Sequence, residues 1–188
     1  MLKDIVTKNR SYRRFHQEKS ISKEMLLELV DLARVTPASK NIQPLKYFIS
    51  NEPEINAKIF PHLAWARHLK NWDGPKEGEK PSAYIIILED ISIGEGFLRD
   101  QGIAAQTIML GATEQNMGGC IIASVNRDEV AKALNIPEKY KITLVLALGY
   151  PSEKVELNEI SPDDNTNYWR DEFDIHHVPK RRLDDILL

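Results

Sequence analysis

The sequence predicts an α+β domain with a mostly antiparallel central sheet of about four strands, flanked by helices. Four short segments are almost continuously apolar, as strands are when both faces of a sheet are buried; they cover residues 47–49, 83–88, 120–123 and 142–148. Two longer segments are predicted as helices, residues 23–35 from their apolar spacing and residues 98–116 up to the break at Gly118-Gly119. With 188 residues, the chain suffices for one domain with a real core, residues 1–188.

Smaller helices are predicted over residues 2–9, 54–60 and from 127 to about 134. Ser22 is a suitable N-cap for the helix over residues 23–35, because its hydroxyl can accept from a free backbone N–H. Asn126 with Glu129 resembles a capping box at the start of the last small helix. Pro61 ends the helix before it, since proline lacks the N–H that a helix needs.

Two segments lack a regular pattern. Residues 61–82 form a loop long enough to suggest a lid over a site. Its Trp65 and Trp72 either stack on a planar ligand or pack the loop onto the domain, and the sequence leaves both open. Residues 152–188 are acidic and poor in aliphatic residues up to position 174, yet end on apolar residues. Since such a tail cannot build its own core, we expect an extended arm that packs on a partner subunit.

Composition limits the class of protein. The net charge of -3 and the pI near 6.0 provide no global field that favours nucleic acid. Cys120 is the only cysteine, which excludes an intrachain disulfide and favours a reducing compartment. The N-terminus has no apolar run of signal-peptide length, and no stretch is long enough to span a bilayer. We therefore expect a soluble cytoplasmic protein without a membrane partner.

Two basic clusters lie at opposite ends of the chain. Arg10-Ser11-Tyr12-Arg13 and Lys180-Arg181-Arg182 offer guanidinium, ammonium and hydroxyl donors suited to a phosphate. Each cluster alone is more simply a solvated basic surface. They can bind one dianionic phosphate together only if the fold brings the termini close.

The segment from Thr36 to Pro44 combines two prolines with small and amide side chains. Ala38 and Ser39 leave room for a bulky group near the backbone, whereas Asn41 and Gln43 each carry a donor and an acceptor. This composition suits a flat heterocycle with both kinds of edge group, but it is also that of an ordinary polar loop.

Other signatures are missing or incomplete. Gly94-Glu95-Gly96 begins a dinucleotide pattern whose third glycine is replaced by Arg99, and no P-loop is present. Cys120 lies in an apolar strand and is better interpreted as a core residue than as a nucleophile. His176-His177 lack a spaced set of further ligands, so we expect no metal. No acid–base pair stands out, and no catalytic side chain is predicted.

Taken in order, these pieces resemble the nitroreductase-like flavoproteins, which bind FMN noncovalently. Arg10-Ser11-Tyr12-Arg13 matches the family's Arg-Ser-x-Arg, and Pro37 to Pro44 matches its Pro-Ser-x-x-Asn-x-Gln-Pro loop with the small residues permuted. The helix over 98–116, the glycine pair and the strand after it follow in the family's order, and Lys180 and Arg182 match its C-terminal phosphate contacts.

The resemblance implies an intertwined homodimer with FMN at the interface. Arg10, Ser11, Tyr12 and Arg13 would lie at the phosphate and ribityl end, with Lys180 and Arg182 completing the phosphate site. The partner subunit would contribute the loop with Pro37, Ala38, Ser39 and Asn41, and Gln43 would contact the ribityl chain or ring edge. Ile122 and Ala123 would direct backbone amides toward flavin N5 and O4. Ser124 stands where the family commonly has glycine.

The implied activity is hydride transfer from NAD(P)H through FMN to an electron acceptor of nitroaromatic or quinone type, by a ping-pong mechanism. The flavin carries the chemistry, which agrees with the lack of a catalytic pair. Arg13 is proposed to favour the reduced, more negative flavin electrostatically. Two alternatives remain at this stage: an FMN store or sensor without turnover, and a structural dimer without flavin.

Overall fold

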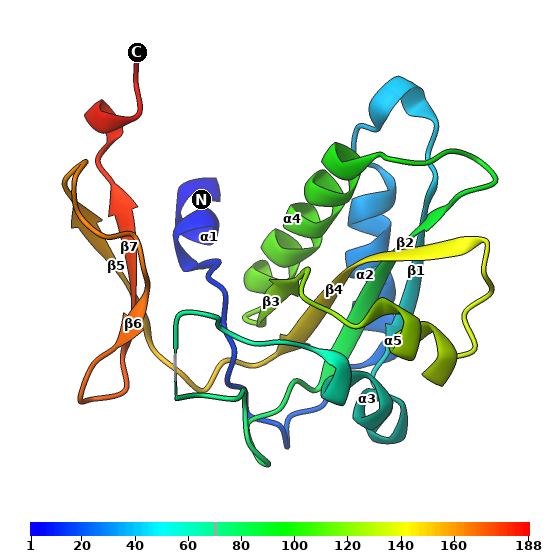
Figure 1. The fold of residues 1–188 in the computed structure, drawn as a ribbon, viewed down its shortest axis with the longest axis horizontal. Helices are drawn as coiled ribbons and strands as arrows, with labels where there is room; N and C mark the ends of the chain where they lie inside the picture. Colours follow the sequence, from blue (N-terminus) through cyan, green and yellow to red (C-terminus); the bar gives the residue numbers. More distant parts are fainter. Residues whose placement is uncertain (70) are drawn as a thin grey trace.

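The computed structural model describes residues 1–69 and 71–188 and confirms the α+β prediction (Figure 1). The central sheet has the strand order β1-β2-β4-β3, and every neighbouring pair is antiparallel. Its members are β1 (Leu45–Ser50), β2 (Ala83–Asp90), β3 (Gly118–Ile122) and β4 (Tyr140–Gly149). The four apolar segments are these strands. The prediction was wrong at β3, because Gly118 and Gly119 already pair with β4 and Ala123 lies beyond the strand's end.

Both faces of the sheet are covered, as the continuous apolar strands predicted (Figure 1). On one face, Ile85 and Ile87 of β2 pack with α2 (Lys23–Arg34) and α4 (Leu98–Glu114). On the other face, Tyr84 and Ile86 pack with α3 (Pro53–Ile59) and α5 (Arg127–Ala133). Alternate residues of one strand therefore enter two separate halves of the core.

The helix boundaries follow the predicted caps. The Ser22 hydroxyl accepts from the N–H of Met25 at 3.2 Å, and the Asn126 side chain accepts from the N–H of Glu129 at 3.4 Å. Single turns of 3₁₀-helix occupy Ser39–Asn41, Phe60–His62 and Leu183–Asp185. Among the described residues, no helix is both long and apolar enough to cross a lipid bilayer.

The C-terminal tail carries strands that the sequence analysis did not predict. β5 (Val155–Ile160) pairs in parallel with β7 (His176–Arg181), and β6 (Trp169–Arg170) pairs antiparallel with β7. Figure 1 shows this second sheet apart from the central one, beside the N-terminal helix α1 (Leu2–Lys8). The fold therefore brings the two ends of the chain, with their basic clusters, to the same side of the molecule.

Candidate functional site

The two basic clusters line one pocket of about 310 Å³, called here the cationic pocket. Arg10, Ser11 and Arg13 enter it from the segment after α1, and Lys180 enters from β7. The remaining wall consists of Val6, Asn9, Gln106, Met109, Gly119, Ile121, Tyr168, His176 and Val178. No carboxylate is among these lining residues, which include three cations, Arg10, Arg13 and Lys180, and two hydroxyl side chains, Ser11 and Tyr168.

A second pocket of about 350 Å³, called here the strand-end pocket, lies where β3 ends. It is lined by Arg13, Ala64, Trp65, Ala66, Arg67, Cys120, Ile121, Ile122, Ala123, Ser124 and Tyr168. Three of these residues, Arg13, Ile121 and Tyr168, also line the cationic pocket. The two pockets are therefore neighbours along β3, one cationic and the other mainly apolar and aromatic.

Arg13 lies where the pockets meet, and its residue is only 9% exposed. Its Nη1 is 3.2 Å from the Ser11 carbonyl oxygen and 3.3 Å from Nε2 of His176, and its Cζ lies 4.9 Å from the centre of the Tyr168 ring. Within the described residues these neutral groups are the hydrogen-bond partners of the guanidinium. Burying a cation without a carboxylate partner costs free energy, and a bound anion would offset that cost. The junction of the pockets is therefore suited to an anion.

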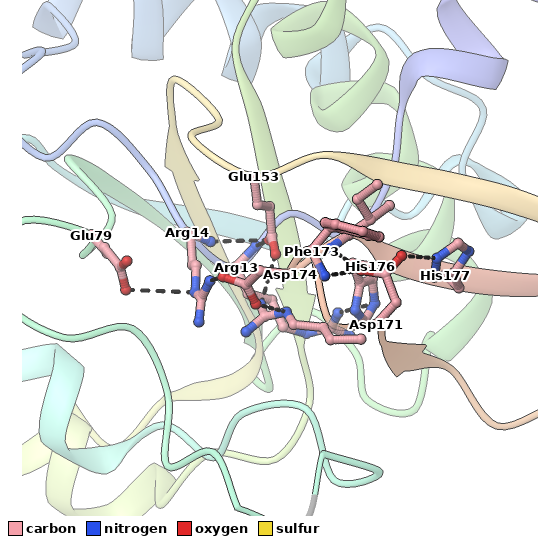
Figure 2. A network of polar contacts seen from close by, with 11 residues as sticks. Arg13, Arg14, Glu79, Glu153, Asp171, Phe173, Asp174, His176 and His177 are labelled. Carbon is pink, nitrogen blue, oxygen red and sulfur yellow. Dashed lines mark hydrogen bonds and ion pairs between the residues drawn. The ribbon is translucent and has the colours of Figure 1, made fainter.

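Glu153 fixes the backbone of Arg13 rather than its side chain. Its carboxylate accepts hydrogen bonds from the backbone N–H of Arg13 and, at 3.1 Å, from that of Arg14, while Arg170 donates to the other oxygen at 2.7 Å. Figure 2 shows this network, in which Arg14 also reaches Asp174 and Glu79. The C-terminal tail thereby fixes the segment that carries Arg13.

Other predicted phosphate residues differ in position. Arg10 lines the cationic pocket and donates through Nη2 to the Val6 carbonyl at 2.8 Å, while its buried Nε has no partner in the described part of the chain. The Tyr12 hydroxyl donates to the Lys8 carbonyl at 3.1 Å, and its ring packs against Gly118. Arg182 pairs with Asp185 at 3.2 Å. Tyr12 and Arg182 line neither pocket of their own chain.

The Thr36–Pro44 loop lies at a different place on the chain. Pro37, Ala38 and Gln43 line a pocket of about 370 Å³ between α2, β1 and Asp100, and Asp100 accepts from the Ser39 N–H at 3.0 Å. Asn41 and Gln43 have positive φ values of 55° and 57°, which is uncommon for residues other than glycine. Neither the cationic nor the strand-end pocket of the same chain is lined by this loop.

The end of β3 is held by Arg127 from the first turn of α5. Arg127 donates to the carbonyls of Ala123 and Thr143 through Nη2, at 3.1 and 3.2 Å, and to that of Ile142 through Nε at 3.1 Å. The Ser124 carbonyl accepts from the Ala64 N–H at 2.9 Å. These bonds fix the predicted residues Ile122 and Ala123 along the strand-end pocket.

The tryptophans have different surroundings. Trp65 is buried, lines the strand-end pocket and lies against Gly74 and Phe60. The guanidinium of Arg170 lies 4.6 Å from the centre of the Trp72 ring, which packs on the core. Trp65 is thus placed both to pack the loop and to meet a ligand.

The sequence analysis missed three residues that shape the site: Glu153, Tyr168 and His176. Tyr168 and Glu153 belong to the tail that lacks a regular pattern, and His176 was considered only as a weak metal candidate. His177, its neighbour, instead contacts Asp171 at 3.0 Å and Asn158 at 2.9 Å. The importance of the three residues arises from contacts with Arg13, which is more than 130 positions away in the sequence.

Comparisons with known proteins identify the family and the fold. The model of the nitroreductase family matches residues 6–150. A protein of Archaeoglobus fulgidus named "Putative NADH dehydrogenase/NAD(P)H nitroreductase" is 26% identical over 82% of this chain and 87% of its own length. The iodotyrosine deiodinase of Thermotoga neapolitana is 23% identical over 88% and 98%. An FMN-dependent nitroreductase of Clostridium difficile R20291 shares the fold with a TM-score of 0.65, 21% identity and coverage of 80% and 87%.

Proposed function

The chain belongs to the nitroreductase family, and on this premise we propose that it is an FMN-dependent oxidoreductase. It transfers hydride from NAD(P)H, through bound FMN, to a small electron acceptor of nitroaromatic or quinone type. One observation above all supports the proposal: the buried Arg13 guanidinium has no carboxylate partner among the described residues and lies at the junction of a cationic and a mainly apolar pocket.

The cationic pocket fits the phosphate of FMN. Arg10, Arg13 and Lys180 supply positive charge and Ser11 supplies a hydroxyl, and guanidinium suits phosphate oxygens in particular. The Nε of Arg10 is buried and lacks a partner among the described residues, so it is a donor available for a phosphate oxygen. In this proposal the three cations neutralise the dianion, and the Ser11 hydroxyl donates a hydrogen bond to it.

The strand-end pocket fits the isoalloxazine ring. Ile121, Ile122 and Ala123 provide one edge of β3, and Tyr168 and Trp65 provide aromatic surface for a flat ring. Arg127 keeps the end of the strand in place through three carbonyls. Arg13 reaches both pockets, so its charge can act on the ring as well as on the ribityl phosphate.

Bound FMN supplies the hydride chemistry, which no side chain of the protein could perform. The chain binds and orients the ring, and Arg13 favours added negative charge on it by electrostatic attraction. Because one open pocket serves both the nicotinamide and the acceptor, the two bind in turn. Parallel lines in a double-reciprocal plot are the expected kinetic result, and intersecting lines would argue against alternating occupancy.

A homodimer accounts for the Thr36–Pro44 loop. The loop lines neither pocket of its own chain, so Pro37, Ala38, Ser39 and Asn41 would meet the FMN of the partner subunit. Apolar side chains exposed along the tail support an interface there: Leu157, Trp169, Phe173, Leu183, Ile186, Leu187 and Leu188. In this proposal residues 152–188 pack on the partner.

The purified protein tests the proposal directly. We expect a yellow protein with a flavin spectrum and one FMN per chain, and a mass in solution of two chains. A colourless protein that does not bind added FMN would contradict the flavin assignment. A flavin that NADH and NADPH both fail to reduce would instead favour a store or sensor.

A further inference from the structure

His176, the first residue of β7, is the neutral partner of the Arg13 guanidinium. It is 1% exposed and lies in the wall of the cationic pocket. Its Nε2 is 3.3 Å from Nη1 of Arg13, and its ring centre is 5.2 Å from that of Tyr168. Arg13, which enters from the other end of the chain, therefore contacts His176 and Tyr168 together.

The geometry fixes which ring nitrogen carries the proton. A guanidinium donates hydrogen bonds and cannot accept them, so Nε2 of His176 has to be the acceptor. In a neutral imidazole the proton then resides on Nδ1. That nitrogen is buried and has no hydrogen-bond partner in the described part of the chain.

We infer that His176 is a positioning residue for Arg13, whose guanidinium it orients toward the bound flavin nucleotide without neutralising its charge. This inference rests on the proposed function. A carboxylate at the same place would orient Arg13 equally well, but it would cancel the charge that the anionic ligand needs. A neutral acceptor provides orientation alone, and the Tyr168 ring supports the guanidinium from its face.

The surroundings keep His176 neutral. Its pKa is lowered from the usual 6.5 to about 4, mainly by burial and also by the positive charges of Arg13 and Arg170 and by the neighbouring His177. The Glu153 carboxylate is engaged by Arg170 and by the backbone N–H groups of Arg13 and Arg14 instead. His176 is thus an acceptor throughout the neutral pH range.

Two substitutions separate orientation from simple packing. His176→Gln places an amide group near the position of Nε2, whereas His176→Asn is too short to reach it. We expect His176→Asn to weaken FMN binding about tenfold, as loss of a hydrogen bond to a charged group does, and to lower the midpoint potential of bound FMN. His176→Gln should stay close to the wild-type protein in both quantities. His177→Asn, the adjacent histidine, is the matched control and should change neither.

The outcomes are distinguishable. Wild-type protein that binds no FMN overturns the proposed function, and this inference with it. If the wild-type protein binds FMN and His176→Asn has the same FMN affinity and midpoint potential, only the inference about His176 is overturned. Equal losses in the Gln and Asn variants would also overturn it, because packing rather than the acceptor would then matter.

A measurement on the wild-type protein applies even if the variants fail to fold. Nitrogen-15 NMR of the His176 ring distinguishes a protonated from a bare nitrogen. We expect a proton on Nδ1 and a bare Nε2 at neutral pH. A proton on Nε2, or on both nitrogens, would overturn the inference.

Discussion

Glu153 and Arg170 form an ion pair of 2.7 Å inside the protein, with side chains 1% and 10% exposed. Arg170 belongs to the small C-terminal sheet, and Glu153 also accepts from the backbone N–H groups of Arg13 and Arg14. The pair therefore fastens the tail to the segment that lines the cationic pocket. The ion pair therefore positions Arg13 as well as stabilising the fold, because it fixes the backbone from which the Arg13 side chain extends.

Removing one member of this pair should be strongly destabilising. Glu153→Ala leaves the buried Arg170 with only a longer contact to Asp174, at 3.8 Å, and frees two N–H groups. We therefore expect a loss of about 3 kcal/mol in the free energy of unfolding. Urea denaturation measures this quantity. Lys154→Ala breaks the exposed Lys154–Glu156 pair, which solvent screens, so its loss of stability should be far smaller than that of Glu153→Ala. Similar losses in both variants would show that the Glu153 network adds nothing beyond a surface pair.

Replacing Arg13 should change the flavin as well as its affinity. Arg13→Gln removes the buried positive charge at the junction of the pockets, so FMN should bind at least about tenfold more weakly and become harder to reduce. Spectroelectrochemical titration of the bound flavin measures the potential. Arg34→Gln, at an exposed residue of α2 paired with Asp31, is the control. An unchanged midpoint potential in Arg13→Gln would remove Arg13 from its proposed role.

The Thr36–Pro44 loop should affect binding more than folding. Asn41→Ala is expected to weaken FMN binding while leaving the core intact, because the side chain of Asn41 forms no described hydrogen bond within its own chain. Asn41 has a φ of 55°, which alanine adopts less readily. Asn41→Gly keeps this backbone conformation and removes the amide, so both variants should lose affinity. If Asn41→Gly binds FMN like the wild-type protein, the amide has no part in the site.

The lowered pKa of His176 predicts how the stability of the folded protein depends on pH. Its pKa is lowered from 6.5 to about 4 in the folded protein, so between these values the unfolded chain binds a proton that the folded chain does not. Stability should therefore fall as the pH decreases from about 6.5 toward 4, and His176 should account for about 2 kcal/mol between pH 7 and 5. Urea denaturation at several pH values, compared with His176→Gln, isolates this contribution. The same pH dependence in both proteins would contradict it.

Much of the fold could be predicted because its signals are local. The apolar runs of β2 and β4 and the Ser22 cap each depend on neighbouring residues. β7 could not be predicted in this way, since His-His-Val-Pro-Lys-Arg contains a proline and basic residues that disfavour a strand in isolation. It forms because β5, which lies well before it in the tail, and β6, which shortly precedes it, pair with its two edges.

The residues of the site likewise fall into those that the sequence predicts and those that only the folded structure reveals. The predicted phosphate site, on condition that the termini meet, consisted of Arg10, Ser11, Tyr12, Arg13, Lys180 and Arg182. The fold brings four of them to one pocket, whereas Tyr12 and Arg182 do not line it. Glu153, Tyr168 and His176 could not be found from sequence, because their role depends entirely on which groups the folded chain places beside Arg13. In the sequence, for example, nothing distinguishes Glu153 from the other acidic residues of the tail, and only the folded structure shows that its side chain is buried.

Anaerobic reduction of the purified protein tests the central claim most directly. The protein is mixed with NADH or NADPH in the absence of oxygen, and the absorbance of its bound flavin is followed. The account predicts that the flavin absorbance is bleached rapidly by at least one of the two nucleotides and restored by a nitroaromatic or quinone acceptor. A protein that retains FMN but whose flavin absorbance neither nucleotide bleaches would contradict it.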